Sequence, residues 1–342
     1  MRVQFTFNLF RRLGWFLLSL VLFVLLWTAI YRITSPGRSI RLVELPDHRR
    51  ESSISSESLR VAAFNIAHGR GGKFGASNWQ DRSLDELRLH LDQIAVQIQR
   101  SGADIVVLNE VDFRSTWSRN LNQAAYIAER AGYRYLVEQR NIDVSIPWFS
   151  LQFGNALLSH HPVESAERIE FQPYSRWQRI LAGNHDGLLA RVQTPSGPVA
   201  VAGVHLEVRS EHIRWLAAQR LHELRDESEI PFVVMGDFNS TPQGFPRSQV
   251  SSQGHNALDH LLDTAGFNRD ATIIGAPPYF TFPSEGPRAI IDWILVGRGL
   301  ELSDSAVVAS DLSDHLMVTA SLCLRPCVSG EGTTILGAVP AE

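Results

Sequence analysis

The stretch Val233-Val234-Met235-Gly236-Asp237-Phe238-Asn239-Ser240 joins an apolar run to an acid and an amide. Such a run is typical of a buried strand, and polar groups directly after it lie where an α/β scaffold presents chemistry to solvent. A second stretch has the same character, because Ile290-Ile291-Asp292-Trp293-Ile294-Leu295-Val296 is followed by Ser313-Asp314-His315. Both stretches predict an α/β fold with its chemistry at strand ends.

Three further apolar runs end in polar groups of the same kinds. They are Val61-Ala62-Ala63-Phe64-Asn65, Ile105-Val106-Val107-Leu108-Asn109-Glu110 and Val201-Ala202-Gly203-Val204-His205. A single acid or histidine at a strand end also arises as a helix cap or a turn residue. Five such ends in one chain instead indicate a catalytic site.

In this order the motifs resemble those of the endonuclease/exonuclease/phosphatase superfamily, from about Leu59 to Leu324. That superfamily includes DNase I-like nucleases, base-excision-repair endonucleases, neutral sphingomyelinases and inositol polyphosphate phosphatases. The most specific matches are Gly236-Asp237-Phe238-Asn239 and Ser313-Asp314-His315; the others are Phe64-Asn65-Ile66, Leu108-Asn109-Glu110-Val111-Asp112, Gly154-Asn155-Ala156-Leu157-Leu158-Ser159 and Val204-His205-Leu206. Asn109 departs from the many relatives that carry Gln. The resemblance implies a DNase I-like α/β sandwich of two packed sheets.

The resemblance also implies a metal site. Glu110 matches the family's principal metal ligand, and Asn65 and Asp314 are the expected further oxygen ligands. Hard oxygen ligands suit Mg²⁺ or Mn²⁺ rather than zinc. Asn155, in the central-strand motif, is expected to bind substrate.

The remaining motif residues match the family's catalytic groups. Asp237 matches the aspartate that activates the attacking water, and Asn239 the amide that holds the phosphate and that aspartate. His205 and His315 are expected to donate a proton or hydrogen bond to the phosphoryl oxygens or the leaving group. Asp292 would orient His315 and raise its pKa.

The N-terminus carries a candidate membrane span. Leu13 to Tyr31 holds no charged residue, and its 19 residues form roughly 28 Å of helix, close to the hydrocarbon thickness of a bilayer. The run ends in bulky residues rather than in a small-residue cleavage site, which favours an uncleaved anchor over a signal peptide. Arginines flank both ends almost equally, so orientation rests on the default for a single N-terminal anchor, which places the catalytic domain outside the cytoplasm.

The organisation expected is an anchor at 1–34, a polar linker at 35–58, a catalytic domain at 59–326 and a tail at 327–342. Within the domain, Leu84 to Ile98 and Ala124 to Ala131 have helical apolar spacing, and Leu188 to Val192 with Val199 to Val204 predict a hairpin. The two cysteines, Cys323 and Cys327, are close enough to form a small disulfide.

Composition permits a full core, since 44% of the 342 residues are hydrophobic, and the net charge of −4 shows no basic excess for nucleic-acid binding. These observations predict a monomeric, single-pass membrane hydrolase of phosphate esters. A phosphodiesterase acting on a phospholipid headgroup is favoured, because an anchor concentrates enzyme at the membrane. The alternatives are an extracytoplasmic DNase I-like endonuclease, which a basic concave face would distinguish, and a catalytically silent binding protein on the same fold.

Overall fold

The computed structural model describes residues 2–34, 40–46, 58–175 and 183–324. Its strands are β1 (Arg41–Glu44), β2 (Leu59–Asn65), β3 (Ile105–Asp112), β4 (Tyr135–Ile146), β5 (Phe149–Ser159), β6 (Val163–Ile169), β7 (Gly187–Thr194), β8 (Gly197–His205), β9 (Phe232–Asp237), β10 (Asp292–Val296), β11 (Leu300–Val308) and β12 (Met317–Leu324). Its helices are α1 (Arg2–Thr34), α2 (Leu84–Ser101), α3 (Gln123–Ala131), α5 (Glu211–Glu227) and α6 (Ala257–Asp259), with short turns η2 (Ala67–Gly69), η3 (Thr116–Ser118) and η4 (His260–Thr264).

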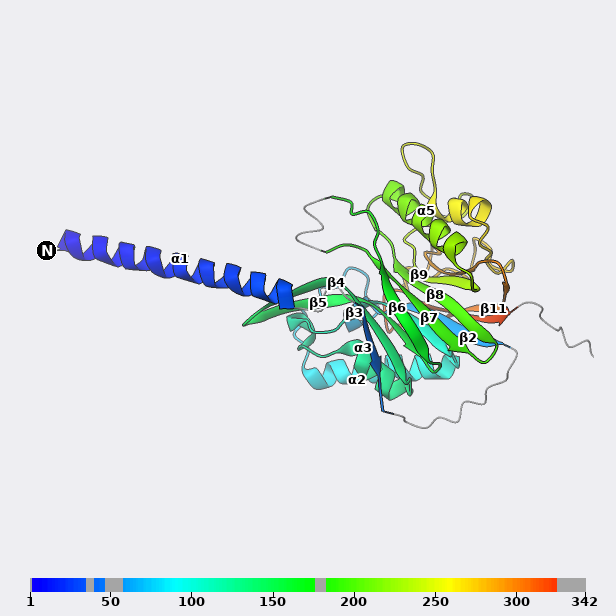
Figure 1. The fold of residues 1–342 in the computed structure, drawn as a ribbon, viewed down its shortest axis with the longest axis horizontal. Coiled ribbons are helices and arrows are strands. Elements are labelled where there is room, and N and C mark those ends of the chain that lie inside the picture. The colour runs from blue at the N-terminus through cyan, green and yellow to red at the C-terminus, as the bar shows by residue number, and fades with distance from the viewer. Residues whose placement is uncertain (1, 35–39, 47–57, 176–182, 325–342) are drawn as a thin grey trace, which may run out of the picture.

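Two sheets lie face to face, and helices cover their outer faces (Figure 1). One sheet has seven strands in the order β1-β4-β5-β3-β2-β12-β11, and the other has five in the order β10-β9-β8-β7-β6. The β2–β3 and β8–β9 pairs are parallel. The predicted two-sheet α/β sandwich is therefore confirmed.

Apolar residues separate into three buried layers. Alternate residues of β8 enter different layers: Val199 and Val201 pack between the sheets, whereas Ala202 and Val204 pack under α5. A strand buried on both faces must be apolar throughout, which explains the continuous runs seen in the sequence. α2 and α3 cover the outer face of the larger sheet.

The predicted local elements are present, with one correction. α2 and α3 form where helical spacing predicted them, and β7 and β8 make the predicted hairpin, with Thr194 opposite Gly197. The expected linker at 35–58, however, contains β1, which pairs antiparallel with β4 at the edge of the larger sheet. The polar composition of this segment hid a four-residue edge strand, because edge strands need little apolar content.

The N-terminal helix projects away from the sandwich, and its C-terminal end contacts β4 (Figure 1). Arg11–Tyr31 has a mean hydropathy of 2.4, and its most apolar window is not buried against the rest of the chain. Its length and composition are sufficient to cross a membrane. At the other end, Cys323 is disulfide-bonded, whereas Cys327 and the predicted tail lie outside the described residues.

Candidate active site

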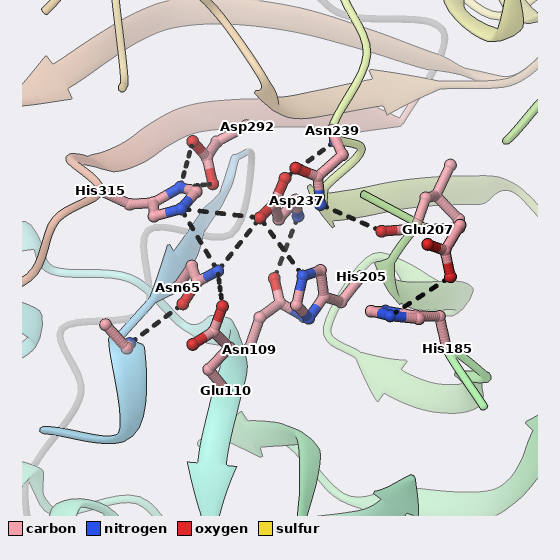
Figure 2. A network of polar contacts seen from close by, with 12 residues as sticks. Asn65, Asn109, Glu110, His185, His205, Glu207, Asp237, Asn239, Asp292 and His315 are labelled. Atoms are coloured by element: carbon pink, nitrogen blue, oxygen red, sulfur yellow. Dashed lines mark hydrogen bonds and ion pairs between the residues drawn. The ribbon is translucent and has the colours of Figure 1, made fainter. Parts of the chain in front are cut away.

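Strand register brings the predicted residues to one edge of the sandwich (Figure 2). Asn65 ends β2 opposite Asn109 of the parallel strand β3. His205 ends β8 opposite Asp237 at the end of the parallel strand β9, and the antiparallel strand β10 begins at Asp292, also opposite Asp237. The polar ends of both sheets therefore meet in one cluster.

An irregularity in β3 aims the predicted metal ligand into the cleft. The pairing of β3 with β5 shifts between Leu108 and Val111, and Glu110 has a φ of 51°. Positive φ is unfavourable for a residue with a side chain, and such strain is typical of functional sites. Asn109 turns inward and accepts a hydrogen bond from the Asp237 backbone N–H at 3.0 Å, while the Glu110 side chain remains 21% exposed.

His315 lies between two buried carboxylates. Its Nδ1 is 3.0 Å from Asp292 Oδ2, and its Nε2 is 3.7 Å from Asp237 Oδ2. Burial lowers the pKa of His315, but Asp292 and Asp237 outweigh burial and raise it to about 10. His315 is therefore an imidazolium at neutral pH, with Nδ1 directed at Asp292 and Nε2 directed at the centre of the cluster.

Asp237 accepts hydrogen bonds at both carboxylate oxygens. The Asn239 backbone N–H donates to Oδ1 at 2.9 Å, and Asn65 Nδ2 donates to Oδ2 at 3.1 Å. His205 Nε2 is 3.5 Å from the same Oδ2. Burial raises the pKa of Asp237 to about 7 even though His315 lowers it, so a proton can be taken up and released near neutral pH.

His205 differs from His315 in its charge. Burial lowers the pKa of His205, although the Glu110 carboxylate raises it. The His205 imidazole is therefore neutral where that of His315 is charged. The two histidines supply one neutral and one charged hydrogen-bond donor to the same space.

Cationic side chains surround Glu110. His68 Nε2 lies 3.3 Å from Glu110 Oε2 while its Nδ1 lies 3.1 Å from Asp112 Oδ1, and Arg70 Nη1 lies 3.9 Å from Glu110. Burial raises the pKa of Glu110, but these neighbours, His68 first among them, lower it to about 2. Burial lowers the pKa of His68, yet Asp112 and Glu110 raise it overall. Glu110 is consequently ionised over the whole physiological range.

Asp314 supplies the observation that bears on a cation. Its carboxylate is buried, with Oδ2 accepting from Arg70 Nη2 at 2.7 Å, while Oδ1 has no hydrogen-bond partner among the described residues. An unpartnered buried carboxylate oxygen is costly unless a ligand satisfies it. Together with the ionised Glu110, Asp314 fits a hard divalent cation.

Two predicted site residues, the metal ligand Asn65 and the substrate-binding Asn155, make contacts other than those predicted for them. Asn65 Oδ1 accepts from the Ala67 backbone N–H at 3.0 Å, and its Nδ2 donates to Glu110 and Asp237. Asn65 therefore offers N–H groups rather than an oxygen to the cleft. Asn155 is fully buried and bonds to Asn109 instead of facing the cleft. Both amides position the residues in front of them.

A second group of acids and an imidazole also has the spacing of a metal site. In the described ranges, Asp237, Asp292 and His315 are the one set whose ligand atoms all lie within 4.8 Å of one another. His315 Nδ1, however, already faces Asp292 through a hydrogen bond. The Nδ1 atom of His315 is therefore already engaged, whereas Asp314 Oδ1 has no hydrogen-bond partner among the described residues.

Four residues of the site were not among the predicted site residues: His68, Arg70, His185 and Glu207. His68 and Arg70 contact the predicted metal ligands, and His185 contacts Glu207 at 3.6 Å while its ring meets that of His205 edge-on at 5.0 Å. Burial and His205 lower the pKa of His185 to about 4. The position of His68 and Arg70 directly after the Asn65 motif was a usable signal, whereas His185 lies outside every motif.

Comparison with known proteins agrees with this geometry. The profile of the Endonuclease/Exonuclease/phosphatase family matches residues 62–315, which is most of the chain. The protein belongs to this family. Members of the family are phosphoric ester hydrolases that depend on a divalent metal, and the protein is thus an enzyme of this class.

Solved structures share the fold at low sequence identity. A family protein from Bacteroides vulgatus has a TM-score of 0.57 at 19% identity, covering 78% of this chain and 99% of its own. A mannosyl-6-phosphatase from Bacteroides thetaiotaomicron has a TM-score of 0.54 at 15% identity, covering 78% and 100%. The human Nocturnin catalytic domain with bound sulfate has a TM-score of 0.53 at 19% identity, covering 83% and 97%. No curated protein matches the sequence significantly.

Proposed function

We propose that this protein is a membrane-anchored, Mg²⁺- or Mn²⁺-dependent phosphodiesterase that acts by in-line attack of water. The observation that carries the proposal is the buried pair of Asp237 and His315, which faces the ionised Glu110 across the strand ends. It combines a base, an acid and a cation-binding carboxylate in one cleft. Phosphoryl transfer needs these groups more than it needs covalent chemistry.

Asp237 is the proposed general base. Its pKa of about 7 matches the operating pH, which is the condition for efficient proton transfer. The Asn239 N–H and the Asn65 amide hold its two oxygens in place. Asp237 would orient the attacking water and accept its proton.

His315 and His205 are the proposed donors. The charged His315 would place its Nε2–H on a phosphoryl oxygen, where negative charge develops, because Asp292 fixes Nδ1 on the opposite side. The neutral His205 would donate a second hydrogen bond from the side of β8. Asp292 and Asn155 act through other residues and are proposed as positioning residues.

Glu110 and Asp314 would hold the divalent cation. When bound, the cation supplies Lewis-acid neutralisation of charge on the phosphoryl and leaving oxygens. The chain's own contribution is to keep Glu110 ionised and to hold Asp314 in place through Arg70. Arg70, at 2.7 Å from Asp314 and 3.9 Å from Glu110, offsets part of the repulsion between them.

A pocket beside the site supports a diester rather than a small monoester. It has a volume of about 340 Å³ and runs outward from Asn239. Phe74 and Phe282 form an aromatic part of its lining, and Phe282 also packs on His315 with ring centroids 4.6 Å apart. Such a pocket has room for the second ester substituent of a phosphodiester.

The apolar helix favours a substrate presented at a membrane. A tether raises the local concentration of the enzyme over the bilayer surface. The test is a panel of phosphodiester, phosphomonoester, nucleic-acid and phospholipid substrates, each with and without Mg²⁺ or Mn²⁺. We expect metal-dependent release from the phospholipid headgroup. Full turnover in excess chelator would overturn the metal assignment, and failure to hydrolyse any phosphodiester would overturn the proposed phosphodiesterase activity.

The endonuclease remains the second candidate because of two arginines. Arg247 and Arg288 are exposed and line the pocket that starts at Asn239. Exposed arginines beside aromatic rings are typical of sites that contact nucleic-acid phosphates and bases. If this candidate is correct, DNA cleavage should fall steeply with salt concentration, and Arg247→Ser and Arg288→Ser should weaken it and reduce that salt dependence. Hydrolysis of a small soluble diester should be affected far less.

A further inference from the structure

A β-hairpin lies beside the end of the apolar helix. β4 and β5 close through the turn Pro147-Trp148, with Ile146 opposite Phe149. Trp27 Nε1 of α1 donates to the Ser145 carbonyl of β4 at 3.1 Å. In Figure 1 the two long strands extend from the sandwich toward α1. The hairpin and the helix are therefore in contact, although Trp27 and Ser145 are 118 residues apart in the sequence.

A second contact fixes the direction in which the hairpin runs. Tyr31 Oη donates to Asp143 Oδ1 at 2.5 Å. From Tyr31 to Trp27 is about 6 Å along a helix, and from Asp143 to Ser145 is about 6.6 Å along a strand. The matched spacing means that β4 follows α1 toward its N-terminus. The tip then reaches at least to the level of Trp27, inside the apolar segment 11–31.

The tip has the chemistry of a segment that enters a membrane interface. Residues 144–151 carry no charge. Trp148 is 61% exposed, and no ring contact to it occurs among the described residues. The strand pairs Ser145–Ser150 and Ile146–Phe149 satisfy the backbone polar groups that face the partner strand. The outward-facing groups of this two-stranded tip suit the headgroup interface, where water and polar headgroups can bond to them, rather than the hydrocarbon core. Tryptophan side chains concentrate at the boundary between headgroups and acyl chains.

Aromatic side chains continue from the tip to the active site. Phe149 stacks on Trp79 with centroids 6.2 Å apart, and Trp79 meets Trp117 at 5.8 Å. Trp117 in turn meets His68 at 5.5 Å, and His68 contacts Glu110. Trp79 is 59% exposed. Phe149, Trp79 and Trp117 thus form an aromatic wall that runs from the hairpin to His68, which contacts Glu110.

We propose that the tip of the β4–β5 hairpin, residues 146–149, is a second membrane contact that inserts into the lipid interface beside α1. This inference rests on the proposed anchoring by α1. Two contacts separated in sequence restrict rotation of the catalytic head, whereas a single helix would leave it free. The aromatic wall then faces the bilayer, and a phosphate ester at the lipid surface meets the cleft without leaving the membrane.

Depth-dependent quenching tests the contact in the full-length protein. Three variants with one added cysteine each are made, Trp148→Cys, Ile274→Cys and Leu20→Cys. Each is labelled with the environment-sensitive fluorophore NBD and placed in phosphatidylcholine vesicles. No reductant is added, because Cys323 is disulfide-bonded. Ile274 is a matched control because it is apolar and 56% exposed, outside the hairpin. Leu20 reports on α1 itself. Spin-labelled lipids should quench the labels at 148 and 20 and leave the label at 274 unquenched.

The three labels separate the two hypotheses. If the label at 20 is quenched and the label at 148 behaves like that at 274, the hairpin inference is overturned and the anchor stands. If the label at 20 is not quenched, the proposed anchoring fails and the hairpin inference falls with it. Trp148→Ser should also lower turnover of a vesicle-borne phosphodiester at least fivefold, with unchanged turnover of a soluble diester; equal loss on both substrates would indicate damage to the fold.

Discussion

Glu110 combines a strained backbone with a charge that two neighbouring side chains balance. It keeps a left-handed backbone in a strand, and its charge is balanced by His68 and Arg70. Glu110→Gln removes the charge at nearly constant shape. We expect a loss of kcat of about 10³-fold and a weaker response to added Mg²⁺ or Mn²⁺, measured by metal titration of the rate. Glu164→Gln, which alters an exposed pair with Arg191, is the control and should retain normal activity.

The pKa values of Asp237 and His315 predict a pH profile. Asp237 must be ionised to accept a proton, so kcat/KM should fall about tenfold per unit as pH drops below the pKa of about 7. His315 must be protonated to donate, so activity should fall again as pH rises through about 10. Asp292→Asn removes a charge that raises the pKa of His315, and its basic limb should move to lower pH. A flat profile from pH 5 to 7 would contradict the role of Asp237.

His315 and Asp292 are expected to act as one unit. Both Asp292 oxygens lie within 3.1 Å of His315 Nδ1, so the main contact of this carboxylate in the site is with the imidazole. Asp292→Asn and His315→Ala should each lower kcat, and the double variant should be little slower than His315→Ala alone. The measurement is a double-mutant cycle in log kcat. Strictly additive losses would show that the two residues act separately.

At the scale of elements, the close approach of β8 and β9 brings His205 beside Asp237. A Cβ added at Gly236 would lie 2.0 Å from the Val204 carbonyl oxygen and 3.0 Å from Asn109 Oδ1. Gly236→Ala should therefore lower the free energy of unfolding by roughly 3 kcal/mol or more, measured by denaturant unfolding in detergent. Gly102→Ala is the control, because Gly102 also has positive φ but open space around it, and about 1 kcal/mol is expected there.

Elements with a clear hydrophobic periodicity could be predicted from the sequence, and local irregularities of the backbone could not. The helical spacing of Leu87, Leu91 and Ile94 specified α2, and apolar runs specified the central strands. Asp237, which ends β9, and His315, in the connection before β12, lie together in the structure as their motifs predicted. The orientation of the Asn65 amide depends on the Ala67 N–H in the following turn, and no sequence period records which way an amide faces.

Contacts across the whole molecule were the least predictable. β1 pairs with β4 over nearly 100 residues, from Arg41 to Glu138, and His185 reaches His205 from another strand connection. Neither pairing leaves a local pattern, because long-range packing decides both. The apolar helix, by contrast, was evident from composition alone, yet its contacts to the hairpin were not.

Removal of the helix tests the architecture as a whole. Because β1 is part of the larger sheet, the deletion should end at Ser39 and leave Ile40 onward intact. The shortened protein should hydrolyse a small soluble diester at the normal rate, since no proposed catalytic group lies before Asn65. It should be at least tenfold slower on the same ester presented in vesicles, because the deletion removes the tether together with the contacts of α1 to the hairpin. The two rates are measured side by side at equal metal concentration. Equal rates on vesicles for both forms would remove the main support for a lipid substrate and move the endonuclease ahead of it.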